Sequence, residues 1–131
     1  MTSGFRTISL MIILLAASLD AAAQENTHKT RQHSHPKYAT LVNPVAKTGE
    51  SLALGKEMYR KHCVACHGEA GKGGSGPALT AAVRLHGSTE GELFHVITDG
   101  VAKTAMKGMR SKLTDEMRWD LVNYIESLKK K

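Results

Sequence analysis

One short run of residues, Cys63-Val64-Ala65-Cys66-His67, limits what the rest of the chain can fold around. It has the pattern C-x-x-C-H, which is the attachment sequence of a c-type haem. The two thiols are placed to add across the two vinyl groups of a haem. The histidine that directly follows them can then bind the iron through a ring nitrogen. Both cysteines of the chain lie in this run, so no cysteine remains for a separate disulfide framework.

Two other kinds of site use a C-x-x-C spacing, and each needs support elsewhere in a sequence. A thiol–disulfide redox pair of the thioredoxin type lies near a βαβ pattern, and none is found in this chain. A structural zinc site needs a second ligand pair, and no second cysteine pair exists. We therefore favour attachment of one haem c over a redox pair and over a zinc site.

The first residues have the composition of a secretory signal peptide. Arg6 gives a short positive start, residues 8–19 are largely apolar but too short to span a bilayer comfortably, and residues 21–23 offer an A-x-A cleavage site. We expect residues 1–23 to be a signal peptide and the protein to be periplasmic, without a permanent membrane span. An uncleaved membrane anchor is the alternative.

Residues 24–43 are polar, have no apolar periodicity, and contain His28, His33 and His35. This composition is typical of a solvated linker, although closely spaced histidines could also bind a metal ion. We place the folded domain at residues 44–131. The formal net charge of +6 is compatible with docking to acidic partners. Aromatic residues are few and no basic recognition helix stands out, so the charge does not indicate a nucleic-acid partner.

The segment before the cysteine run has the spacing of an amphipathic helix. Residues 51–62 place Gly55 and Tyr59 on one helical face, and Ser51 can cap the start of the helix. Glycine is costly inside a helix. Its presence is explained if another helix crosses closely at Gly55.

Two more helices are expected after the cysteine run. Residues 90–99 follow Thr89, and residues 115–129 follow Thr114; both threonines can cap a helix. The expected apolar faces are Leu93, Phe94 and Ile97 in the first, and Met117, Leu121, Tyr124, Ile125 and Leu128 in the second. Residues 68–81 are rich in glycine, lack the ending of a phosphate loop, and are expected to wrap around a flat cofactor. The predicted fold class is all-α, with three or more helices packed around one covalently bound haem.

Several motifs together resemble the class I c-type cytochromes, which are small monohaem electron carriers. The resemblance covers about residues 49–128. Its parts are Gly55 and Tyr59, the C-x-x-C-H-G run, Gly76-Pro77-Ala78-Leu79, Thr104-Ala105-Met106, and Leu113-Thr114-Asp115-Glu116 with Trp119, Leu121, Val122, Tyr124 and Ile125. It implies a small cytochrome c fold in which the first helix crosses the last one near Leu121 and Tyr124.

The resemblance also implies roles for five residues. Cys63 and Cys66 would carry the thioether bonds, and His67 would be the proximal ligand of the iron. The second ring nitrogen of His67 would donate a hydrogen bond to the backbone carbonyl of Pro77, which fixes the orientation of the ring. Met106 stands where the family has its distal methionine, and a thioether in that position raises the reduction potential of the iron.

Other residues compete for the distal position. The family usually has proline after its methionine, whereas Lys107 follows Met106 in this chain. Met109 lies three residues further on, where the family often has an apolar packing residue. His86, His95 and Lys107 are further candidates. The simpler interpretation is a helix-surface or core position for His95 and an exposed loop position for His86.

A site closed by two axial ligands favours electron transfer over catalysis. We therefore expect an electron carrier rather than an enzyme, with an iron that cycles between the ferrous and ferric states. The loops expected around the haem contain Lys72, Lys103, Lys107 and Lys112, which could steer an acidic redox partner. The alternatives are a haem-bearing subunit of a periplasmic dehydrogenase or oxidase, and a haem sensor with an open iron site.

Overall fold

The computed structural model describes residues 34–130, which form five α-helices and no strand. The helices are α1 (Pro36–Ala39), α2 (Gly49–His62), α3 (Val64–His67), α4 (Glu90–Asp99) and α5 (Asp115–Ser127), with a 3-10 turn at Glu69–Gly71. The predicted all-α fold class is confirmed. None of these helices is long and apolar enough to cross a membrane. The predicted signal peptide at residues 1–23, together with His28 and His33, lies outside the described residues.

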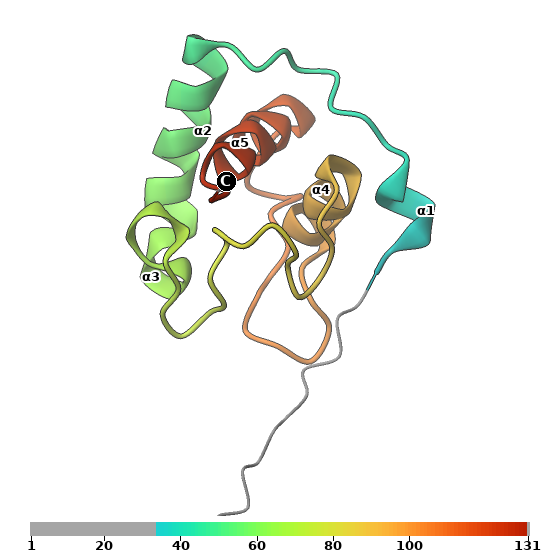
Figure 1. Cartoon of the computed structure of the whole chain (residues 1–131), viewed down its shortest axis with the longest axis vertical. Helices are drawn as coiled ribbons and strands as arrows, with labels where there is room; N and C mark the ends of the chain where they lie inside the picture. The colour runs from blue at the N-terminus through green and yellow to red at the C-terminus, as the bar shows by residue number, and fades with distance from the viewer. Residues whose placement is uncertain (1–33, 131) are drawn as a thin grey trace, which may run out of the picture.

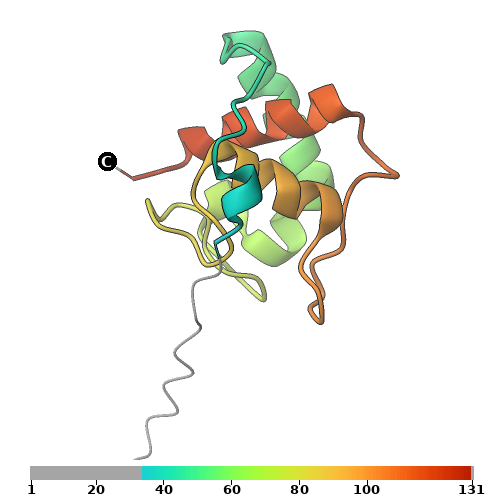
Figure 2. The ribbon, with the colours of Figure 1, turned by 90° about the vertical axis from the view of Figure 1, so that its right-hand side faces the viewer.

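The helices form one packed group, from which two long loops extend. α5 contacts both α2 and α4, and α1 contacts α4 on its other side (Figure 1). The loop after α3 and the loop between α4 and α5 extend toward the same end of the molecule in both views (Figure 1 and Figure 2). The residues predicted to bind the cofactor lie on or next to these two loops.

The crossing of α2 and α5 depends on a glycine. Gly55 is buried, and a Cβ atom added to it would lie 2.1 Å from the backbone oxygen of Asp120 and 2.8 Å from the Cβ atom of Tyr124. One turn later, the ring centroid of Tyr59 lies 5.3 Å from that of Tyr124. The predicted close crossing at Gly55 is therefore confirmed.

The predicted caps are confirmed for two helices and wrong for one. Thr89 caps α4 and Thr114 caps α5, as expected. The N-cap of α2 is Thr48, so this helix begins before the predicted start at Ser51. Ser51 is buried inside the helix instead, where its hydroxyl donates to Oδ1 of Asp120 at 2.6 Å. Its hydroxyl thus bonds to the crossing helix rather than to the backbone of its own helix.

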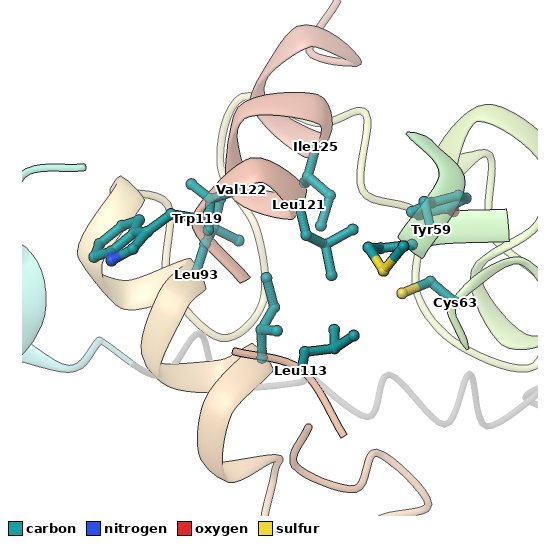
Figure 3. Packing of buried hydrophobic residues seen from close by; sticks show 10 residues of the cluster. Tyr59, Cys63, Leu93, Leu113, Trp119, Leu121, Val122 and Ile125 are labelled. Carbon is teal, nitrogen blue, oxygen red and sulfur yellow. The ribbon is translucent and has the colours of Figure 1, made fainter. Parts of the chain in front are cut away.

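The hydrophobic core lies where α2, α4 and α5 meet (Figure 3). Its buried residues are Met58, Tyr59, Cys63, Leu93, Ile97, Leu113, Trp119, Leu121, Val122 and Ile125. Met117 is 41% exposed, so its predicted place on the inward face of the last helix is wrong. Trp119 and Val122 are buried because α5 packs between two helices, and Trp119 stacks on Phe94 of α4 with ring centroids 3.9 Å apart. α5 ends at Ser127, before the predicted end at Lys129.

Residues 34–43 were expected to belong to a solvated linker, but they contain α1, which packs against α4. The ring of Tyr38 stacks on His95, with centroids 3.9 Å apart and planes 11° apart. The backbone N–H of His35 donates to Glu92 at 2.8 Å. Polar groups of this segment therefore find partners on α4 and, through the side chain of Asn43, on α5, far away in sequence, which its composition alone does not indicate.

Replacing Glu92 by glutamine is expected to lower the free energy of unfolding by about 2 kcal/mol. The buried Glu92 carboxylate accepts hydrogen bonds from five groups. These are the hydroxyls of Ser34 and Thr89 and the backbone N–H groups of His35, Ser88 and Thr89. Each carboxylate oxygen accepts at least one backbone N–H, so an amide nitrogen in place of either oxygen would face a donor that cannot accept in return. Denaturant unfolding of the haem-loaded protein measures the loss, with Glu116→Gln as the exposed control.

The loss of stability in Glu92→Gln should depend on pH, because the Glu92 carboxylate can be protonated. Burial alone would raise the pKa of Glu92, but the donors around it outweigh burial and hold the pKa at about 2, below its ordinary value of 4.5. The stabilisation is therefore complete above pH 4.5 and is lost as the pH falls through about 2. The difference between the wild type and Glu92→Gln should shrink across this window. A difference in stability that stays constant between pH 4.5 and about 2 would show that the ionised Glu92 carboxylate is not the stabilising group.

Candidate functional site

The C-x-x-C-H run forms the junction between α2 and α3. The backbone N–H of Cys63 donates to the carbonyl of Tyr59 at 2.8 Å, which closes the last turn of α2. The N–H of His67 donates to the carbonyl of Cys63 at 2.8 Å, which forms the single turn of α3. Cys63 is buried, Cys66 is exposed, and both are free thiols. Residues three and four apart lie within about one helical turn, so both thiols and the histidine come from the same turn.

The ring of His67 is buried and held by a carbonyl group. Its Nδ1 atom lies 2.8 Å from the carbonyl oxygen of Pro77, so the predicted contact between these two residues is present. A carbonyl oxygen can only accept, so Nδ1 carries the proton and the lone pair of the neutral ring lies on Nε2. This is the arrangement of a metal-binding histidine whose second nitrogen is fixed by the protein.

The glycine-rich loop after α3 closes on this histidine. Gly73 donates its N–H to the carbonyl of His67 at 2.7 Å, and Gly76 donates to the carbonyl of Cys66 at 2.8 Å. A Cβ atom on Gly76 would lie 3.0 Å from Cε1 and 3.1 Å from Nδ1 of the His67 ring. Glycine at this position therefore lets the loop backbone approach the ring.

Apolar side chains from other elements face the cysteine turn. Figure 3 shows the sulfur of Cys63 pointing toward the part of the core that contains Leu113 and Leu121. Leu121 is fully buried, and Leu113 and Cys63 are nearly so. Two free thiols, an imidazole with its lone pair on Nε2 and an apolar wall are the groups that a covalently attached haem requires. The residues present therefore fit a haem.

One observation argues against a thiol–disulfide redox site. Burial, and to a smaller extent the neighbouring Cys66 thiol, raises the pKa of Cys63 to about 11. Reactive redox thiols have a lowered pKa instead, so Cys63 does not have the character of a thiol–disulfide catalyst. Within residues 34–130, no three His, Cys, Asp or Glu side chains are grouped so that they could hold a metal ion.

Met106 and its competitor Met109 lie in different environments on the loop between α4 and α5. Met109 packs against the hydrophobic core, and its N–H donates to the carbonyl of Ile97 at 2.8 Å. Met106 is half-buried and outside that core cluster. The side chain of Met109 is thus used in packing, as the family resemblance implies.

His95, Lys107 and His86 are the other candidates for the distal position. His95 is covered by the ring of Tyr38, and its Nδ1 lies 3.0 Å from a carboxylate oxygen of Asp99. Lys107 is exposed, and its Nζ donates to the carbonyl of Thr104 at 3.2 Å. His86 is half-buried in the loop before α4.

Tyr59 makes a contact at this site that the sequence did not predict. Its hydroxyl donates to the carbonyl oxygen of Gly68, directly after His67, at 2.8 Å. Burial, with a smaller effect of Cys63, raises the pKa of Tyr59 to about 12, so the hydroxyl remains a donor at neutral pH. The apolar spacing marks Tyr59 as an inward residue, but nothing in the sequence indicates which group accepts the hydrogen bond of its hydroxyl.

Comparison with known proteins places the chain among haem proteins. Residues 50–125 match the family described as cytochrome c oxidase, cbb3-type, subunit III. The dihydro-haem d1 dehydrogenase of Pseudomonas aeruginosa is 38% identical over 85 residues, which are 65% of this chain and 17% of that protein. Cytochrome c55X of Paracoccus denitrificans is 43% identical over 65 residues, which are 49% of this chain and 62% of that protein. The chain thus spans less than two thirds of each of these relatives.

A solved structure supports the same fold. Cytochrome cL from Hyphomicrobium denitrificans superposes with a TM-score of 0.57 and is 29% identical in sequence. The superposition covers 61% of this chain and 48% of that protein. The arrangement of helices around the cysteine turn is therefore shared with a solved c-type cytochrome.

Proposed function

The chain belongs to the family of cytochrome c oxidase, cbb3-type, subunit III, and from this premise we propose that it is a periplasmic one-electron carrier with both axial positions of its iron filled. The cytochrome c domains of this family bind haem c covalently and transfer electrons, and this chain has one attachment sequence. The observation that carries the proposal is the buried ring of His67, which Pro77 holds with Nε2 as the available ligand atom.

Four residues would hold the haem. Cys63 and Cys66 would be joined to it by thioether bonds, and Nε2 of His67 and the sulfur of Met106 would be its axial ligands. When bound, the haem supplies an iron that exchanges one electron between the ferrous and ferric states. The Pro77 carbonyl keeps the proton on Nδ1 and makes His67 a stronger ligand. Met106 would keep small molecules off the sixth position, which favours electron transfer over catalysis.

Covalent attachment is the first test of this proposal. When the protein is produced together with a haem-attachment system, its mass should rise by that of one haem, and the reduced protein should give a c-type visible spectrum. Replacing both Cys63 and Cys66 by alanine should abolish the covalent mass increase, whereas Cys66→Ala alone leaves one possible thioether. An unmodified mass in the wild type, with a disulfide between the two cysteines, would contradict the proposal.

Exposed lysines on the two loops would provide the docking surface for an acidic redox partner. Lys72 lies on the loop after α3, and Lys103, Lys107 and Lys112 lie on the loop between α4 and α5; all four are exposed. Charges of one sign around a site attract partners of the opposite sign and raise the rate of encounter. The same two loops contain Pro77 and Met106.

Reversing the charge of Lys72 and Lys112 together, by Lys→Glu changes, is expected to slow electron transfer from an acidic redox protein about tenfold at low salt. The difference should shrink as the ionic strength rises, because salt screens exposed charges. Stopped-flow kinetics measures both effects. The control is the same double reversal at Lys47 and Lys56, which are exposed at α2 and its start. Equal slowing in both double variants would indicate a net-charge effect only.

A permanent haem-bearing subunit of a larger redox complex is the second candidate function. The family match favours it, because that family is described as an oxidase subunit. Affinity purification of the tagged protein from its native host separates the two candidates. A stoichiometric oxidase or dehydrogenase in the purified material would identify a subunit, and a monodisperse small haem protein would identify a free carrier.

A further inference from the structure

The loop between α4 and α5 closes on itself around Thr104. The hydroxyl of Thr104 donates to the carbonyl of Val101 at 2.8 Å and accepts the N–H of Met106 at 3.1 Å. The backbone N–H of Thr104 donates to the same Val101 carbonyl at 3.2 Å. Its own carbonyl accepts from Nζ of Lys107 at 3.2 Å. Every polar group of Thr104 therefore bonds within the loop that contains Met106.

The base of the loop is held by backbone pairing. Val101 donates its N–H to the carbonyl of Met106 at 3.0 Å, and Gly100 forms an antiparallel bridge with Lys107. A Cβ atom on Gly100 would lie only 2.5 Å from the carbonyl oxygen of Met106, and its φ of +77° also favours glycine. Both backbone groups of Met106 are thus bonded: the carbonyl to Val101, and the N–H to the Thr104 side chain.

Lys107 follows Met106, and a lysine restricts the neighbouring backbone less than a proline would. Proline, which usually follows the methionine in the cytochromes that this chain resembles, fixes its own φ and restricts the residue before it. Lysine does neither. Lys107 contributes a side-chain bond to the carbonyl of Thr104 instead, which ties the two sides of the loop together.

We propose that Thr104 is a positioning residue for Met106, and that its hydroxyl supplies the restriction of the methionine backbone that a following proline would otherwise give. The hydroxyl does so by bridging the N–H of Met106 and the carbonyl of Val101. The inference rests on the proposed function, since it matters for electron transfer only if Met106 is the distal ligand.

Two substitutions separate the hydroxyl from the shape of the side chain. Thr104→Val keeps the branched shape and removes both hydroxyl bonds, whereas Thr104→Ser keeps the hydroxyl. Ser111→Ala, at an exposed position further along the same loop, serves as the control. In the haem-loaded wild type, carbon monoxide can bind ferrous iron only after Met106 has left it. Thr104→Val is expected to speed this binding about fivefold to tenfold, which is the effect of losing the one hydrogen bond that ends on the backbone of Met106. Thr104→Ser and Ser111→Ala should stay within about twofold of the wild type.

A second readout does not depend on the iron ligand. Hydrogen exchange of the Met106 amide should be about fivefold to tenfold faster in Thr104→Val than in wild type, and unchanged in Thr104→Ser. Unchanged exchange in Thr104→Val would overturn the inference, as would faster exchange with an unchanged rate of carbon monoxide binding. Rapid carbon monoxide binding to the wild type is a different result, because it would refute Met106 as the ligand and with it the proposed closed site.

Discussion

Replacing Met106 by alanine is expected to open the sixth coordination position of the iron. The ferric protein should lose its near-infrared methionine–iron charge-transfer band, and the ferrous protein should bind carbon monoxide faster by orders of magnitude. The physical reason is that a thioether that fills the position must leave before another ligand can enter. The reduction potential should fall as well, because the thioether stabilises ferrous iron more than water does. Absorption spectroscopy and stopped-flow mixing measure these effects.

Met109 provides the matched control for this substitution. It is a methionine of the same loop whose side chain packs against the core. Met109→Ala should keep the charge-transfer band and the slow binding of carbon monoxide, but lose about 2 kcal/mol of stability by removing packed atoms. If the band were lost in Met109→Ala and kept in Met106→Ala, Met109 would be the ligand and the loop assignment would be reversed.

Replacing Gly55 by alanine is expected to destabilise the haem-loaded protein by about 3 kcal/mol or more. The added Cβ atom would lie 2.1 Å from the backbone oxygen and 2.7 Å from the carbonyl carbon of Asp120. These are backbone atoms of α5, which no change of side-chain rotamer can move. The two helices must therefore separate, and the helix that leads into Cys63 must shift with them.

Gly49 is a second glycine of the same helix and serves as the control. A Cβ atom at Gly49 would meet nothing within 4 Å, so Gly49→Ala should be neutral or stabilise by up to about 1 kcal/mol through helix propensity. Denaturant unfolding of both haem-loaded variants gives the comparison. If Gly55→Ala were as stable as Gly49→Ala, the close crossing of α2 and α5 would be refuted.

Features set by neighbouring residues were predictable from the sequence, and features set by distant partners were not. α4 and α5 begin as predicted because Thr89 and Thr114 cap helices through bonds to the next turn. Thr48 and Ser51 are both suitable caps for α2, and the choice between them depends on Asp120, which draws the Ser51 hydroxyl to α5.

The same distinction explains the other errors in the predicted fold. Residues 34–43 look like a linker because their partners, Glu92 and His95, lie on α4. Met117 matches the spacing of the inward stripe of α5, but that stripe is centred elsewhere because α5 packs against both α2 and α4. Periodicity alone does not determine how wide the buried face of a helix becomes.

The candidate site shows the same limit. The cysteine run is a local motif, and the contact of His67 with Pro77, implied by the family resemblance, is present. Met106 as the axial ligand stays a prediction. The hydroxyl bonds of Tyr59 and Thr104 were not foreseen, because each one ends on a backbone group whose direction is set by the loop conformation. Gly68, for example, has a φ of +72°.

Cyclic voltammetry of the haem-loaded wild-type protein most directly tests the claim that this chain transfers one electron without a change of axial ligands. The account predicts one reversible one-electron wave, whose midpoint does not change with scan rate or with the addition of carbon monoxide on the timescale of the scan. A wave that splits with scan rate, or that moves when carbon monoxide is added, would show that a ligand leaves the iron on reduction. That result would contradict a closed electron-transfer site.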